Sequence, residues 1–229
     1  MNKLNDVFHI HMSDDHINRV PNLIKLWGTD DKILCLGTWN RGTKPDNMVI
    51  SNMERLLEID GMDVKIPYDS AEFKYCLCVG VLNYMKEPHK VASEIHRVLE
   101  DYGQLYIEVP FLQPYDPTHV DYYRFTPAGL RLLLKGFIVD EFGIANGPGS
   151  TMHWISRVYS ALKFDREGTI DDITTKLGDS DYLEADRIFG MAYEDIKETD
   201  EVLNYKEHAS LIACSYYMLA TKDASDSIT

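Results

Sequence analysis

The chain has few of the features that mark secreted, membrane or metal-binding proteins. Its 229 residues hold only four cysteines, and no two of them have the spacing of a zinc site: Cys35, Cys76, Cys78 and Cys214. No apolar run approaches the roughly 20 residues of a membrane-spanning helix, and the first residues lack the apolar core of a secretory signal. The sequence therefore predicts a cytoplasmic protein with reduced, buried thiols, no metal site and no membrane span.

Basic residues are also scarce. The formal net charge is −14, from 23 Lys and Arg against 37 Asp and Glu, and no basic stripe could follow a phosphate backbone. This composition argues against a nucleic-acid partner. The segment 164–201 alone carries thirteen acidic and four basic residues. Apolar residues at helical spacing predict an amphipathic helix there that covers the domain, through Ile188, Phe189, Ala192, Tyr193 and Ile196.

Short apolar runs that alternate with helical patterns predict a mainly parallel α/β sheet. Helical spacing occurs in part of residues 1–31, where Pro21 interrupts or starts a helix, and again from Pro88 to Tyr102-Gly103. A Gly/Pro loop is expected over 145–154. The strand patterns cover residues 33–36, 48–51, 62–66, 74–82, 104–110, 137–145 and 211–220.

One composite site is expected at the carboxyl ends of the strands, where such sheets bind ligands. Gly37, Gly80 and the loop from Pro110 to Arg124 each follow a predicted strand. A helix with Thr126 as N-cap, Pro127 in its first turn and Gly136 at its end closes this loop. The alternative is a purely structural loop, held by tyrosine hydroxyls and an Asp121–Arg124 pair. The loop is dense in polar and aromatic residues: Gln113, Tyr115, Asp116, His119, Asp121, Tyr122, Tyr123 and Arg124.

Two segments resemble known methyltransferases. VGVLNYMKEPHKVASEIHRVLEDYGQLYIEVPF resembles class I S-adenosylmethionine-dependent methyltransferases, where a strand precedes a helix of pattern E-x-x-R-V-L-x-x-G-G. PFLQPYDPTHVDYYRFTPAGL is similar to a narrower group from polysaccharide and lipopolysaccharide gene clusters. The resemblance implies a Rossmann-like α/β fold with a mainly parallel seven-stranded sheet, an antiparallel last strand and a helical insertion before it. It implies one domain, with an N-terminal helical segment (1–31), a core (32–145), an acidic helical cover (150–208) and the last strand (209–222).

The same resemblance implies an activity and a set of site residues. S-adenosyl-L-methionine would be the cofactor, and the reaction would be O-methylation of a sugar or glycan-precursor hydroxyl in polysaccharide biosynthesis, in a monomer or a homodimer. Catalysis would fall to His119, Asp121 and Arg124, with His119 or Asp121 as the base that takes the hydroxyl proton. The methyl acceptor, a small molecule or glycan, would meet Tyr115, Asp116, Tyr122, Tyr123 and His153. Cofactor contacts would come from Gly37, Thr38, Trp39, Asn52, Glu54, Asp69, Gly80 and Leu82.

The cofactor loop departs from the family pattern. Cys35 stands where the family has an acidic residue, and Trp39 stands where it has a second glycine. The segment that lies by the adenine in the family is shortened to PYDSAEF. These departures support an alternative, a catalytically inactive methyltransferase fold that acts as a binding or scaffolding module. A nicotinamide-dependent dehydrogenase is disfavoured because no G-x-G-x-x-G follows the first strand.

Overall fold

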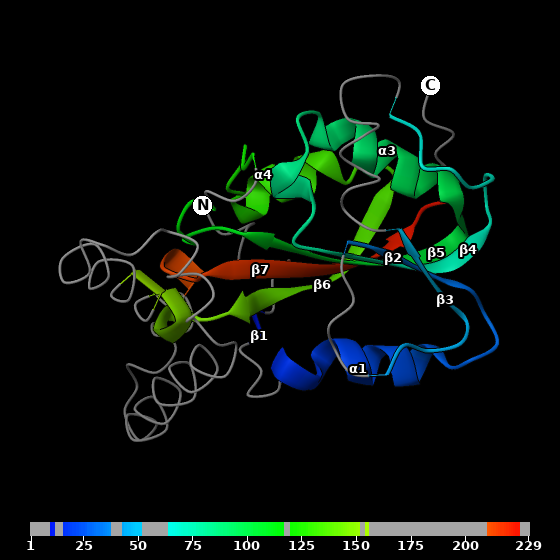
Figure 1. The fold of residues 1–229 in the computed structure, drawn as a ribbon, viewed down its shortest axis with the longest axis horizontal. Coiled ribbons are helices and arrows are strands. Elements are labelled where there is room, and N and C mark those ends of the chain that lie inside the picture. Colours follow the sequence, from blue (N-terminus) through cyan, green and yellow to red (C-terminus); the bar gives the residue numbers. More distant parts are fainter. Residues whose placement is uncertain are drawn as a thin grey trace, which may run out of the picture.

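A single seven-stranded sheet with helices on both faces organises the protein (Figure 1). The structure is a computed structural model that describes residues 10–11, 16–37, 43–51, 64–116, 120–151, 154–155 and 210–224. Helix α1 (His16–Trp27) lies against one face of the sheet. Helices α3 (Pro88–Val98) and α4 (Pro127–Leu133) lie on the other face. The predicted acidic helix within 164–201 lies outside the described residues.

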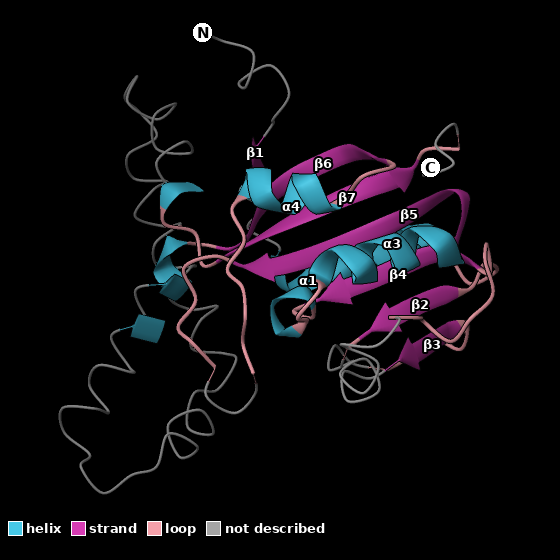
Figure 2. Cartoon of the chain, turned by 90° about the horizontal axis from the view of Figure 1, so that it is seen from above, coloured by secondary structure: helices cyan, strands magenta, loops and turns pink. Residues whose placement is uncertain are grey.

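The strand order is β1-β6-β7-β5-β4-β2-β3 (Figure 2). Strand β7 runs antiparallel to both of its neighbours, whereas the other neighbouring pairs are parallel. The predicted fold class is therefore confirmed. The strands are β1 (Ile10–His11), β2 (Ile33–Leu36), β3 (Met48–Ser51), β4 (Phe73–Val79), β5 (Leu99–Pro110), β6 (Phe137–Asn146) and β7 (Ser215–Lys222).

Several predicted boundaries were wrong. Residues 64–66 form no strand, and the short β1 takes the seventh place in the sheet. The predicted strand 74–82 ends at Val79, because Gly80 turns the chain with φ +62° and a 3-10 turn, η1 (Leu82–Tyr84), follows. The helix expected to reach Tyr102-Gly103 ends at Val98, where β5 begins. Apolar runs alone do not locate such ends, since core residues continue from one element into the next.

Three other expectations also needed correction. Helix α1 continues through Pro21 rather than breaking there, because Val20 and Trp27 on either side are buried against the sheet. The Gly/Pro loop includes a helical turn over residues 148–151. The last strand begins at Ser215 instead of 211, since residues 210–211 are helical. At α4 the predicted start is confirmed: the Thr126 side chain accepts a hydrogen bond from the Gly129 amide.

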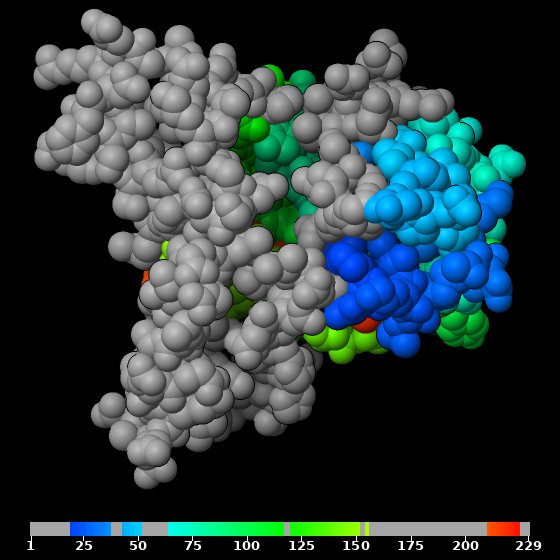
Figure 3. All heavy atoms as spheres, turned by 60° about the horizontal axis from the view of Figure 1, so that its bottom comes forward, coloured from blue at the N-terminus to red at the C-terminus, as the bar shows by residue number. Residues whose placement is uncertain are grey.

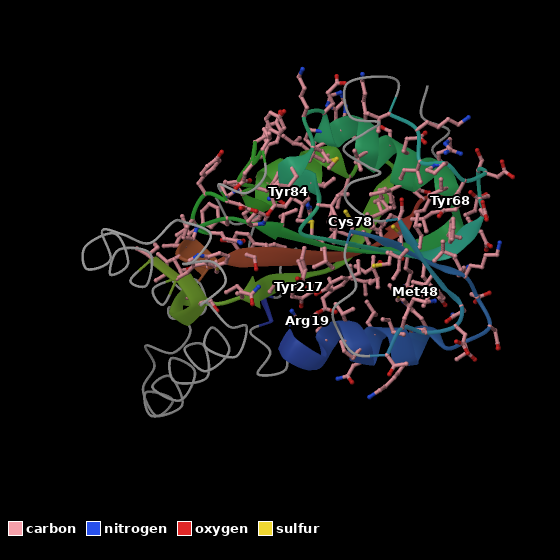
Figure 4. All side chains as sticks on the ribbon, in the orientation of Figure 1. Arg19, Met48, Tyr68, Cys78, Tyr84 and Tyr217 are labelled. Atoms are coloured by element: carbon pink, nitrogen blue, oxygen red, sulfur yellow. The ribbon has the colours of Figure 1, made fainter. Side chains whose placement is uncertain are left out.

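The two faces of the sheet carry separate cores. Figure 4 shows Tyr84 and Cys78 on the side of α3, and Arg19 and Tyr217 on the side of α1. On the α1 side the Trp27 ring stacks on Tyr75 at 4.5 Å between centroids, and the Arg19 guanidinium lies 3.7 Å from the Tyr217 ring centre. All four cysteines are buried and none of them forms a disulfide, as predicted. Burial raises the pKa of the Cys76 thiol, so this thiol is a packing group and not a nucleophile.

Helix α1 exposes its outer face to solvent. Figure 3 shows residues of this helix, in blue, on the surface beside residues 43–51, in lighter blue. Leu26 is an exposed large apolar residue of the helix. Among the described residues, no helix has the length and apolarity needed to cross a membrane.

Candidate functional site

Four parallel strand ends meet at one edge of the sheet. Strands β3, β2, β4 and β5 are consecutive neighbours and parallel, so their carboxyl ends coincide. Direct hydrogen bonds join these ends: the Gly37 amide donates to the Ser51 carbonyl at 2.9 Å, and the Gly80 amide donates to the Glu108 carbonyl at 3.1 Å. This carboxyl edge is where open α/β sheets bind their ligands.

The two turn glycines have different surroundings. Gly37 has φ +99°, and a Cβ added there would lie 2.8 Å from Val81 Cγ2. The turn after β2 therefore closes tightly onto the turn after β4. Gly80 has φ +62°, but an added Cβ would meet no atom of the described residues within 4 Å. The edge therefore combines a tightly packed turn at Gly37 with an exposed turn at Gly80, whose backbone a ligand could approach.

Two buried polar atoms at this edge have no hydrogen-bond partner among the residues that the structure describes. They are the Ser51 hydroxyl oxygen, at the end of β3, and the Asn83 amide oxygen, in the turn η1 after β4. Both residues are at least 97% buried. Buried polar atoms in native proteins are nearly always paired, so two unpaired ones at one strand edge suggest a place where ligand groups complete the hydrogen bonding.

A bidentate ion pair fixes the loop between β5 and α4, residues 111–126, called here the β5–α4 loop. The Arg124 guanidinium donates to both carboxylate oxygens of Asp121, each at 2.6 Å. It also donates to three backbone carbonyls, those of Gln113 at 2.9 Å, Pro114 at 2.7 Å and Tyr123 at 2.9 Å. These bonds use all five N–H groups of the guanidinium, so Arg124 has none left for a substrate.

The Asp121 carboxylate also accepts several hydrogen bonds from within the protein. Besides Arg124, it accepts hydrogen bonds from the Asp116 amide at 3.0 Å and from the Asn83 side chain at 3.2 Å. Its side chain is only 1% exposed. Burial acts to raise the pKa of Asp121, but the hydrogen bonds from these donors outweigh it and hold the pKa below its usual value. A buried carboxylate with four bonds is poorly suited to take a proton, so the geometry favours the structural role for this pair.

The loop presents its tyrosines to solvent. Tyr115, Tyr122 and Tyr123 are 66%, 47% and 39% exposed. Beneath them, the Tyr84 hydroxyl donates to the Asp116 carboxylate at 2.9 Å. Burial, and next this hydrogen bond, raise the pKa of Tyr84. The exposed rings are thus available to a ligand, while the tyrosine below them anchors the loop to the turn after β4.

The structure brings only part of the predicted site together. Gly37 and Gly80 lie at the carboxyl edge with the β5–α4 loop, whereas the side chain of Leu82 is buried in the core, which leaves only its backbone to meet a ligand. Asp69 does not reach this edge, because the amides of Ala71 and Glu72 bond to the end of α3 beside the amino ends of the strands. Other predicted residues lie outside the described part of the chain: Thr38, Trp39, Asn52, Glu54, His119 and His153.

Sequence reasoning missed Ser51, Asn83 and Tyr84 as site residues. Ser51 is the last residue of a predicted strand and so could have been placed at the edge from its position alone. Asn83 and Tyr84 directly follow the predicted strand 74–82, and nothing in the sequence indicates the 3-10 turn that points them toward the loop. Within the described ranges, no group of three His, Cys, Asp or Glu residues could hold a metal ion.

Comparison with known proteins agrees with this architecture. A family model described as a methyltransferase domain matches residues 38–107. No curated protein matches the chain.

Among solved structures, the [4+2]-cyclase SpnF is 16% identical, with a TM-score of 0.47, and covers 90% of this chain and 81% of its own. A protein described as a sarcosine dimethylglycine methyltransferase from Galdieria sulphuraria is 12% identical, covers 92% and 85%, and has a TM-score of 0.49. Phosphoethanolamine N-methyltransferase 2 of Haemonchus contortus is 14% identical, covers 90% and 52%, and has a TM-score of 0.46.

The sheet order carries the assignment of the fold. Strand β7 is inserted antiparallel between β5 and β6, and β3, β2, β4 and β5 form the parallel half that ends at the candidate site. The segment matched by the methyltransferase model begins just after β2 and includes β3, β4 and most of β5. The chain therefore has the Rossmann-like α/β fold of the class I S-adenosylmethionine-dependent methyltransferases.

Proposed function

We propose that the protein is an S-adenosylmethionine-dependent methyltransferase that methylates a hydroxyl group of a sugar or glycan precursor. The observation that carries the proposal is the carboxyl edge of β2, β3 and β4, with its tight Gly37 turn, open Gly80 turn and unpaired Ser51 hydroxyl. The methyltransferase match over residues 38–107 spans this edge. The sugar acceptor is inferred from the similarity of the β5–α4 loop to enzymes of polysaccharide gene clusters.

The residues at the edge fit an S-adenosyl compound. The unpaired Ser51 oxygen can bond to a ribose hydroxyl or amino group, and the absence of atoms around the Gly80 Cβ position leaves room for a ligand beside the backbone. The remaining proposed cofactor contacts rest on the sequence resemblance alone; they are Thr38, Trp39, Asn52 and Glu54. The cofactor supplies a methyl group made electrophilic by the sulfonium, and the chain has to align it with the acceptor and remove a proton.

The β5–α4 loop is proposed to form the wall that meets the methyl acceptor. Its exposed rings, Tyr115, Tyr122 and Tyr123, offer flat apolar surfaces to a sugar while their hydroxyls remain polar. Asp121 and Arg124 act as positioning residues, because their hydrogen bonds are all used within the protein. His119 keeps the role of general base in this proposal, with Asp116 and His153 as polar contacts of the acceptor.

Thermal unfolding with and without S-adenosylhomocysteine tests the cofactor part of the proposal. A ligand at about 100 times its dissociation constant adds roughly 2.7 kcal/mol of stability. For a domain of this size, this corresponds to a rise of about 5–10 °C in Tm. No rise at millimolar ligand would contradict an active methyltransferase and support the alternative, an inactive fold kept as a binding or scaffolding module.

Methyl transfer itself distinguishes the active enzyme from the inactive fold. We expect tritium from the labelled methyl group of S-adenosylmethionine to appear on a hexose or nucleotide-sugar acceptor, in a base-stable ether linkage. Cofactor binding without transfer to any sugar hydroxyl would contradict the proposed acceptor class. The His119→Ala variant should retain binding and lose most of the transfer rate, because only the proton-accepting group is removed.

A further inference from the structure

Asn83 is a buried residue that connects the two halves of the candidate site. It lies in η1, three residues after Gly80, and is 3% exposed. Its backbone carbonyl accepts hydrogen bonds from the amides of Tyr122 at 2.8 Å and Tyr123 at 3.2 Å. One residue of the turn after β4 therefore holds the last part of the β5–α4 loop, just before α4.

The side chain of Asn83 makes a second link whose chemistry fixes its orientation. The carboxylate of Asp121, ionised under its lowered pKa, can only accept hydrogen bonds. The Asn83 Nδ2 group must therefore be the atom that faces Asp121, 3.2 Å away. Consequently Oδ1 points elsewhere, and this buried oxygen has no donor in the part of the chain that the structure describes.

We propose that Asn83 is a positioning residue that couples ligand binding at the end of β4 to the β5–α4 loop. In this role Oδ1 accepts a hydrogen bond from an N–H or O–H group of the bound S-adenosyl compound, while Nδ2 and the backbone carbonyl hold the loop. This inference rests on the proposed function. Because coupling between two sites is reciprocal, the ligand tightens the loop and the intact loop tightens the ligand.

Two variants of Asn83 test the coupling by calorimetry with S-adenosylhomocysteine. Asn83→Leu removes both polar atoms at similar volume, and we expect the dissociation constant to rise about tenfold or more, the effect of one lost hydrogen bond. Asn83→Ser keeps a hydroxyl that can donate to Asp121 but lacks an amide oxygen. It should weaken the ligand similarly while preserving more of the stability of the unliganded protein.

Asn47 supplies a matched control. Its Oδ1 is also buried and has no partner within the described ranges, and its Nδ2 donates to the carbonyl of Asp31 at 2.6 Å. Asn47 precedes β3, however, at the amino edge of the sheet. Asn47→Leu should lower Tm as Asn83→Leu does, yet leave the dissociation constant of S-adenosylhomocysteine within twofold of the wild type. A structural role alone would change Tm in both variants and affinity in neither.

Hydrogen exchange at the loop amides gives the second readout. In the wild-type protein S-adenosylhomocysteine should slow exchange at the amides of Tyr122 and Tyr123, and this ligand-induced protection should vanish in Asn83→Leu and Asn83→Ser. Wild-type affinity in both variants, or unchanged exchange in the wild type on ligand binding, would overturn the coupling alone. Failure of the wild-type protein to bind the ligand would overturn the proposed function, and the coupling with it.

Discussion

The same arrangement of an arginine and a carboxylate three residues before it holds a segment at each edge of the sheet. At the amino edge Arg97 donates to both carboxylate oxygens of Glu94, each at 2.7 Å, and to the carbonyls of Ile66 and Tyr68. We call this pair the amino-edge clamp and the pair Asp121–Arg124 the carboxyl-edge clamp. In each clamp the carboxylate also accepts a backbone amide, from Ile66 and from Asp116.

The two clamps differ in what they hold. The amino-edge clamp fixes residues 64–70, which place Val64 and Ile66 in the core, and its carboxylate is 15% exposed. The carboxyl-edge clamp fixes a loop with exposed tyrosines, and its carboxylate is 1% exposed with a further bond from Asn83. The first therefore serves folding, whereas the second gives a fixed shape to a loop that leaves its aromatic surface open. A bidentate arginine–carboxylate pair thus supports the core at one edge and a candidate site at the other, although Arg97 binds through Nε and Nη2 and Arg124 through Nη1 and Nη2.

The largest expected effect is on the free energy of unfolding when the arginine of either clamp is replaced by alanine. Arg124→Ala leaves the buried Asp121 charge unpaired, and we expect a loss of about 3–5 kcal/mol in the free energy of unfolding. Arg97→Ala should cost less, about 1–3 kcal/mol, because Glu94 can be hydrated more easily. Urea unfolding of both variants provides the measurement. Equal losses would contradict the ranking by burial.

Acid should weaken the carboxyl-edge clamp specifically. The pKa of Asp121 is lower in the folded state than in the unfolded state. The ionised carboxylate therefore stabilises the fold fully at a pH above the unfolded-state pKa, and this stabilisation is lost as the pH falls through the folded-state pKa. The stability difference between the wild type and Asp121→Asn should therefore be constant at neutral pH and shrink below about pH 4. Urea unfolding across pH 2–7 checks this. A difference that persists unchanged at the lowest pH would mean that the charge of Asp121 does not stabilise the fold.

Conservative substitutions in the two clamps should differ in their effect on ligand affinity, even if both change stability only slightly. Arg97→Lys and Arg124→Lys both keep a positive charge but lose the bidentate geometry. We expect Arg124→Lys to weaken S-adenosylhomocysteine by about tenfold through the Asn83 link, and Arg97→Lys to leave the dissociation constant nearly unchanged. Calorimetry on the two proteins, at a temperature where both remain folded, makes the comparison. Equal weakening would show that the amino edge also supports the ligand.

The smallest effect is expected at Ser51. Replacing its buried, unpaired hydroxyl in Ser51→Ala should leave the unliganded protein as stable as before or about 1 kcal/mol more stable. The same variant should bind S-adenosylhomocysteine more weakly, since the ligand loses a partner. A less stable variant with normal affinity would show that the hydroxyl serves the fold rather than the ligand.

The sequence predicted the class of the sheet better than the details of the site. Apolar runs located β2 and β3 at their observed bounds, and the capping residue Thr126 with Pro127 located the start of α4. Both signals are local properties of the sequence. Asp69 was misplaced, since its position depends on hydrogen bonds to the distant end of α3. The sequence also could not predict that every N–H group of Arg124 is hydrogen-bonded within the protein. Three of its acceptors are backbone carbonyls, which every residue has, so no residue type marks them.

Amide chemical-shift mapping with S-adenosylhomocysteine tests the central claim most directly. If the carboxyl edge is the cofactor site of a methyltransferase fold, the largest shifts will occur at Gly37, Ser51 and Gly80–Tyr84. Smaller shifts will reach Tyr122 and Tyr123 through Asn83, and none will reach Ile66–Ser70. No shift at saturating ligand, or shifts centred on Ile66–Ser70 at the amino edge, would contradict the account.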